Sequence, residues 1–88
     1  MASIEQVKIH KKELDALNHE LLMKMNDKGQ STTLGSIRMG LLSAEYSHFI
    51  NNAGQHTTDE EVASVLGIMA EHKRDIAAKI ESIKKEGS

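Results

Sequence analysis

Apolar residues recur at three- and four-residue steps in three runs along this chain, and two short polar stretches separate the runs. Such steps place apolar side chains on one face of a helix. The polar stretches, residues 26–32 and 51–57, combine Asn and Gly with Ser or Thr, a composition typical of turns. We therefore predict an all-α fold, an elongated three-helix bundle with helices over about 4–26, 33–50 and 58–86, in a single domain over residues 1–88.

The first and third helices have clear start signals. Ser3 stands three residues before Gln6, and Thr58 three residues before Glu61, so that each pair can form a capping box. The apolar stripe of the first helix includes Val7 and Leu14, and that of the third includes Ile76, Ile80 and Ile83. We expect these two helices to begin at their capping residues.

The second helix is apolar around much of its circumference. One stripe comprises Leu34, Ile37, Leu41, Ala44 and His48, and another comprises Met39, Leu42, Tyr46, Phe49 and Ile50. This distribution predicts that the second helix is the central and most buried one. The small residues Gly35, Ser36, Gly40 and Ser43 predict close approach of a neighbouring helix, since each Gly inside a helix costs about 1 kcal/mol relative to Ala.

The predicted third helix is too long for a sphere. A helix over residues 58–85 would be about 42 Å long, whereas a compact chain of 88 residues has a diameter of about 31 Å. Either this helix bends, with Gly67 as the natural place, or its C-terminal half projects with the first helix and leaves an apolar stripe for a partner.

Composition excludes several classes of function. The chain has 88 residues, no cysteine, 39% hydrophobic residues and a net charge of −2. The absence of cysteine excludes disulfides, thiolate metal sites and a cysteine nucleophile. We expect neither a signal peptide nor a membrane span, because the chain has no apolar run long enough for either, and we expect a cytoplasmic protein.

The candidate catalytic groups are scattered. The five histidines, His10, His19, His48, His56 and His72, have no metal-ligand spacing. We interpret His48, on the apolar stripe of the second helix, as a hydrogen-bonded and partly buried structural residue. With no nucleophile paired to a base, we predict no catalytic site, no metal and no cofactor.

Charge is distributed unevenly along the chain. Residues 45–71 carry five acidic residues and no Lys or Arg, whereas residues 73–85 carry five basic residues against two acidic ones. The candidate nucleic-acid contacts are Lys73, Arg74, Lys79, Lys84 and Lys85, with Arg38 as a helper. The alternative is that these cations complement the helix dipole and keep the surface soluble. For Arg38 we also predict a structural ion pair, with Glu45 or with a carboxylate of a neighbouring helix.

Two runs resemble the GatB/YqeY domain family. The run from Leu34 to Ala44, LGSIRMGLLSA, is similar to the family's T-L-R-x-L-L-S-A helix, and the run from Thr58 to Leu66, TDEEVASVL, is similar to its D-E-E-V helix start. The segment His72-Lys73-Arg74-Asp75 resembles the basic segment that follows in the family. The resemblance covers most of residues 14–86 and implies a YqeY-like N-terminal helical portion, an accessory module associated with tRNA or with a protein.

Three functions follow as hypotheses. The first is a non-enzymatic helical interaction module that binds a protein partner or a second copy of itself through the stripe of the first and third helices. Its candidate contacts are Val7, Leu14, Ile76, Ile80 and Ile83. The second is an accessory domain associated with tRNA or other RNA. The third, implied by the resemblance alone, is a role related to carbon–nitrogen ligases of the amidotransferase type.

Overall fold

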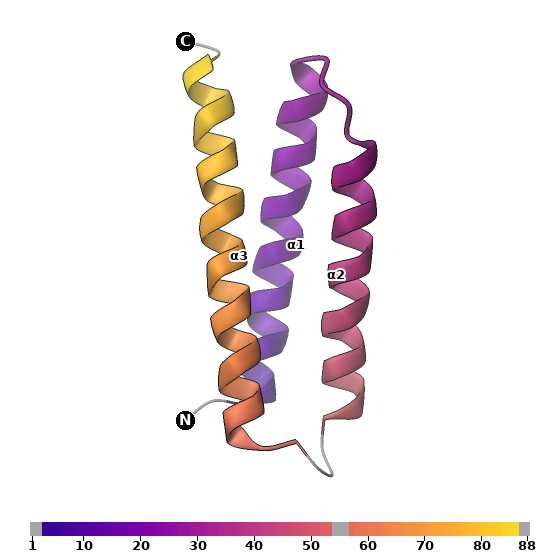
Figure 1. Cartoon of the computed structure of the whole chain (residues 1–88), viewed down its shortest axis with the longest axis vertical. Helices are drawn as coiled ribbons and strands as arrows, with labels where there is room; N and C mark the ends of the chain where they lie inside the picture. Colours follow the sequence, from indigo (N-terminus) through magenta and orange to yellow (C-terminus); the bar gives the residue numbers. More distant parts are fainter. Residues whose placement is uncertain (1–2, 54–56, 87–88) are drawn as a thin grey trace.

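The chain folds into three helices that run up, down and up along one long axis (Figure 1). The structure, a computed structural model, describes residues 3–53 and 57–86. Its elements are α1 (Ile4–Asp27), α2 (Thr33–Asn52) and α3 (Asp59–Glu86). The all-α three-helix prediction is confirmed, and each helix boundary lies within two residues of its predicted position.

Local sequence signals set the ends of the helices. The side chain of Ser3 and that of Gln6 each accept a hydrogen bond from the other residue's backbone N–H, and Thr58 and Glu61 form the equivalent capping box at the start of α3. At the end of α1, Gly29 adopts a positive φ of 73°, and the backbone N–H of Gln30 donates to the carbonyl of Met25. This Schellman arrangement requires a residue that tolerates the left-handed region, which explains a glycine there.

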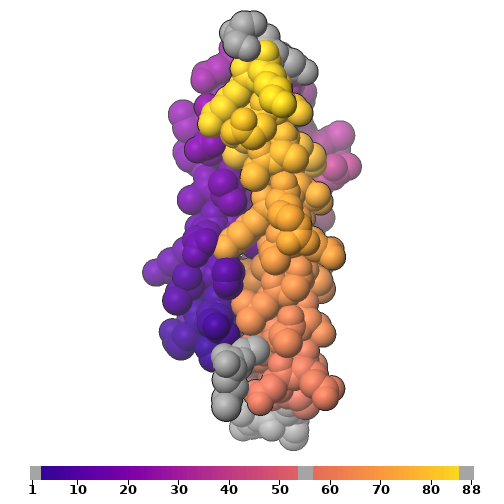
Figure 2. All heavy atoms as spheres, turned by 90° about the vertical axis from the view of Figure 1, so that its left-hand side faces the viewer, coloured from indigo at the N-terminus to yellow at the C-terminus, as the bar shows by residue number. Residues whose placement is uncertain are grey.

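The core lies between α1 and α3, which run parallel to one another. Buried residues recur every seven positions in both helices: Val7, Leu14 and Leu21 in α1, and Val62, Met69 and Ile76 in α3. This spacing keeps one apolar seam facing the partner helix, as in a coiled coil. Figure 2 shows the surfaces of the two helices in contact along the length of the molecule.

The prediction that the second helix is central and most buried is wrong. Over residues 3–53 and 57–86, α1 packs against both other helices, whereas the backbones of α2 and α3 do not come into contact. All twenty residues of α2 are described, and Tyr46 alone among them is buried. Its two apolar stripes lie on opposite sides of the helix, so that a single neighbour, α1, covers only one of them.

The molecule is a flat, elongated slab. Its Cα extents are 48 × 22 × 14 Å, and its radius of gyration is 14.7 Å, against about 12 Å for a compact chain of this length. Helix α3 continues unbroken through Gly67, so that position does not end or interrupt the helix. The predicted elongation is therefore confirmed, and it arises from two long parallel helices that cover one another's apolar stripes.

The glycines of α2 differ in their surroundings. A Cβ added at Gly35 would lie 2.9 Å from Cδ2 of Leu22, so Gly35 permits the close approach of α1 and α2. A Cβ at Gly40 would meet nothing within 4 Å. The predicted close approach is therefore confirmed at Gly35 and is wrong at Gly40, which lines an open pocket between α1 and α2.

Candidate protein-interaction surface

The outward face of α2 is an exposed apolar stripe. We define the α2 outer face as Leu34, Ile37, Leu41, Ala44 and His48. The first three side chains are 69%, 54% and 62% exposed, and Ala44 and His48 are exposed as well. Ile37 stands nine residues before the buried Tyr46, which is about 2.5 helical turns, so the two side chains point in opposite directions. The middle of the α2 outer face thus lies on the side of α2 away from α1, whereas Leu34, at its N-terminal end, lines the groove between α2 and α3.

Very little charge interrupts this face. Arg38 and Glu45 are the only charged residues in α2, whereas charged residues are frequent throughout α1 and α3. Both are exposed, and they stand seven residues apart, about two turns, on the same flank of the α2 outer face. An exposed apolar stripe with few charges is the composition of a surface that becomes buried in a complex.

Arg38 does not form the predicted structural ion pair. Within the described part of the chain, no salt bridge joins it to Glu45 or to any other carboxylate. Arg38 lies instead at the edge of a groove of about 350 Å³ between α2 and α3, where Asp75 and Lys79 also line the wall. The interpretation of His48 as partly buried is also wrong: it is exposed, and its Nδ1 lies 3.2 Å from Nδ2 of Asn52.

The predicted partner-binding residues belong to the chain's own core. Val7, Leu14, Ile76 and Ile80 are at most 5% exposed, and Ile83 packs partly buried against the same cluster. The seam between α1 and α3 closes on itself, so this stripe is not on the surface. The apolar stripe that is left open is that of α2.

The predicted nucleic-acid residues are not equivalent in the structure. Lys73 is only 20% exposed, and its Nζ lies 2.6 Å from Oε2 of Glu13 and 2.5 Å from Nδ1 of His10. Lys84 lies 3.7 Å from the carboxylate of Glu81. The remaining members, Arg74, Lys79, Lys85 and Arg38, are exposed. Arg38 and Lys79 line a common groove between α2 and α3.

A polar cluster sits inside the otherwise apolar seam. Positions 62, 66, 69, 73, 76, 80 and 83 form an unbroken heptad pattern in α3, with Lys73 as its one polar member. His10 interrupts the corresponding pattern of α1. Because an ammonium group can only donate, Nδ1 of His10 must accept the hydrogen bond from Lys73. The hydrogen bond and the charge of Lys73 lower the pKa of the nearby Glu13 carboxyl.

Sequence reasoning missed this cluster, although both heptad patterns carry a signal for it. His10 and Lys73 are each the polar exception in an apolar series, and a polar residue in a seam requires a partner across it. Their pairing across the seam requires the register of α1 against α3 that the structure shows.

A second polar contact joins α2 to α3. The hydroxyl of Tyr46 lies 3.4 Å from Nδ1 of His72. Burial raises the pKa of Tyr46, and the negative charge of Glu45 raises it further. The side chains of Tyr46 and His72 bridge two helices whose backbones stay apart.

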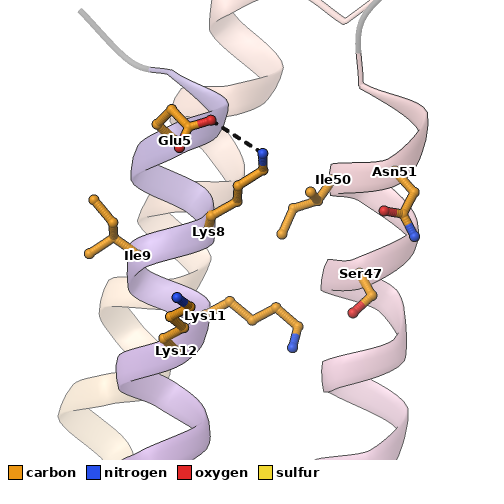
Figure 3. A pocket seen from close by; sticks show the side chains of 8 residues that line it. All are labelled: Glu5, Lys8, Ile9, Lys11, Lys12, Ser47, Ile50 and Asn51. Atoms are coloured by element: carbon orange, nitrogen blue, oxygen red, sulfur yellow. Dashed lines mark hydrogen bonds and ion pairs between the residues drawn. The ribbon is translucent and has the colours of Figure 1, made fainter.

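The pocket between the N-terminal half of α1 and the C-terminal half of α2 has a volume of about 370 Å³ (Figure 3). Two of its lysines already have carboxylate partners: Lys8 lies 3.2 Å from Glu5, and Lys11 lies 3.0 Å from Asp15. Ile50 and Ser47 form the opposite wall, and neither supplies an acid or a base. The pocket thus sets a carboxylate and three lysines of α1 opposite Ser47, Ile50 and Asn51 of α2.

The described residues contain neither a cluster of metal ligands nor a membrane-spanning helix. Among residues 3–53 and 57–86, no three His, Asp or Glu side chains converge as metal ligands. His56, one of the five histidines, lies outside the described residues. No helix in the described ranges is both long and apolar enough to cross a bilayer.

Comparison of the chain with protein-family models, with curated proteins and with solved structures finds no match. The resemblance to the GatB/YqeY family therefore stays a prediction, and the function is inferred from the surface itself.

Proposed function

We propose that this protein is a non-enzymatic helical interaction module that binds a protein partner through the α2 outer face. The observation that carries the proposal is the exposure of Leu34, Ile37 and Leu41 in one stripe. Burial of apolar surface stabilises a complex by about 25 cal/mol per Å² before the costs of association are subtracted. Three large aliphatic side chains on one helix face therefore form a plausible anchor for a helix or sheet of a partner.

The arrangement of the helices supports this choice of surface. Helix α2 is held by α1 on one side, and it packs there through Tyr46 and the close approach at Gly35. Helix α2 lies at one edge of the slab (Figure 1), and Ile37 and Leu41 are exposed there, whereas Leu34 lines the groove towards α3. A partner can reach the α2 outer face without any rearrangement of the seam.

The test is site-specific photo-cross-linking in cells. A photoreactive amino acid replaces Leu41 on the α2 outer face and, as the matched control, Ile68 on α3, which is similarly exposed at 54%. We expect protein adducts from position 41 well above those from position 68. Equal yields at the two positions would contradict the proposal.

Binding of tRNA or other RNA is a second candidate, favoured by one observation. Arg38 and Lys79 come from different helices and line the same groove between α2 and α3. Asp75 lines that groove too, and Lys73 is engaged by Glu13, so the positive charge available there is small. A tRNA titration at two salt concentrations tests this candidate, because phosphate contacts weaken steeply with salt. Absence of binding at low salt would exclude it.

The amidotransferase-related role is a proposal that rests on the family resemblance alone. The polar contacts of Lys73 with His10 and Glu13, and of Tyr46 with His72, join the helices to one another. No geometric observation in the described residues supports amide transfer. An assay of amide transfer with the purified chain tests it, and absence of activity would exclude it.

A further inference from the structure

We infer that the partner of the α2 outer face is a second copy of this chain, with the two α2 helices antiparallel and a two-fold axis passing near Leu41 and Leu42. This inference rests on the proposed function and adds the identity of the partner. It follows from the symmetry of the apolar stripe and from the positions of the two charges beside it.

The stripe is nearly symmetric about its own middle. A two-fold interface is self-complementary: if residue i of one copy contacts residue j of the other, then j also contacts i. The α2 outer face extends from Leu34 to His48 and has its midpoint at Leu41. Two copies related by a two-fold axis at this point would cover each other's stripes over their whole length.

The charges match the antiparallel arrangement. When two helices pack antiparallel, the same flank of each helix faces the same flank of the other. Arg38 and Glu45 share one flank, and the point midway between them lies between Leu41 and Leu42. The axis that superimposes the stripes therefore also places Arg38 of each copy opposite Glu45 of its neighbour, and both charges gain a partner.

A parallel arrangement provides no such match. Parallel packing brings opposite flanks together, and the other flank of the α2 outer face carries Thr33, Gly40 and Asn51, none of which is charged. Arg38 and Glu45 would then be placed beside uncharged residues. Since Arg38 has no ion pair within the described residues of its own chain, the antiparallel dimer is the arrangement that uses both charges.

The size of the surface sets the strength of association. Helix α2 is about 30 Å long and about 10 Å wide, so its face falls below the roughly 800 Å² per partner of a typical stable complex. We therefore expect a reversible equilibrium between monomer and dimer that depends on protein concentration.

Charge reversal tests the arrangement. R38E produces a flank with two acidic residues, and E45R produces a flank with two basic residues. Because both positions are exposed, we expect both variants to fold, and circular dichroism checks this. R74E, at an exposed position on α3, is the matched control. Sedimentation velocity over a concentration series measures the dimer fraction of each variant and of the equimolar mixture of R38E with E45R.

We expect R38E and E45R each to weaken self-association roughly tenfold, because like charges then face each other across the interface. We expect their equimolar mixture to form a heterodimer at least as tight as the wild-type dimer. R74E should behave as wild type. A wild-type chain that stays monomeric at all concentrations, or a mixture that does not recover association, would overturn the inference. If position 41 still cross-links a different protein, the proposed function survives and only the identity of the partner is wrong; if it cross-links nothing above the control, both fail.

Discussion

The seam between α1 and α3 and the outer face of α2 are both apolar stripes with helical spacing, yet one is closed and the other is open. In the seam, Leu14 is 2% and Met69 0% exposed, whereas Leu41 on the α2 outer face is 62% exposed. In the seam, the apolar stripe of α1 packs against a stripe of matching length on α3. Among the described residues, no second stripe covers the α2 outer face, so its side chains stay exposed while those of the seam stabilise the fold.

Truncation of the two stripes should give the largest contrast. L14A or M69A leaves a cavity in the seam and should lower the free energy of unfolding by about 2–5 kcal/mol. L41A removes an exposed side chain and should change it by less than about 0.5 kcal/mol at dilute concentration. Urea unfolding followed by circular dichroism measures both. A loss at Leu41 comparable to that at Leu14 would mean that α2 is covered within the monomer.

The polar cluster tests what holds the seam in register. K73A leaves Nδ1 of the half-buried His10 without its donor and should lower the free energy of unfolding by about 1 kcal/mol. The double variant H10L/K73L replaces the pair with apolar side chains and should restore at least the wild-type stability. Urea unfolding of the two variants beside wild type decides the matter, and a double variant less stable than K73A would contradict this role.

The glycines of α2 distinguish its two sides. G40A faces open space and should raise the free energy of unfolding by about 1 kcal/mol, the difference in helix propensity between Gly and Ala. G35A should gain less, because Leu22 must move to admit the new Cβ. Thermal unfolding of the two variants gives the comparison, and an equal gain at both positions would place Gly35 in open space as well.

The smallest expected effect is the pH dependence of the Glu13 contact. The pKa of Glu13 is lowered from its ordinary 4.5 by its hydrogen bond to Lys73, so the folded state favours the ionised carboxylate. The resulting stability is present above pH 4.5 and is lost as the pH falls through the lowered pKa. The melting temperatures of wild type and E13Q should therefore converge between pH 6 and pH 3. If the difference in melting temperature between wild type and E13Q stays constant over this pH range, the contact between Glu13 and Lys73 is not its cause.

The sequence signals that proved right are local ones. The capping boxes at Ser3 and Thr58 involve residues three positions apart, so their geometry does not depend on the rest of the fold. The turn at Gly29 is equally local. For the same reason the three helices and their ends could be predicted from the sequence.

The packing of the helices could not be predicted in the same way. The two stripes of α2 look alike in the sequence, and the pattern does not indicate which of them α1 covers or that the backbone of α3 stays apart from that of α2. The pairing of His10 with Lys73 joins residues 63 positions apart, so it depends on the register of α1 against α3. The sequence therefore predicts partner contacts on the first and third helices, whereas the open apolar stripe belongs to the second.

Methyl NMR spectra over a concentration series test the central distinction most directly. The account predicts that the methyl signals of Leu34, Ile37 and Leu41 shift or broaden as the protein concentration rises, while those of Leu14, Ile76 and Ile80 in the seam stay fixed. Concentration-dependent shifts in the seam, or none on the α2 outer face, would contradict it.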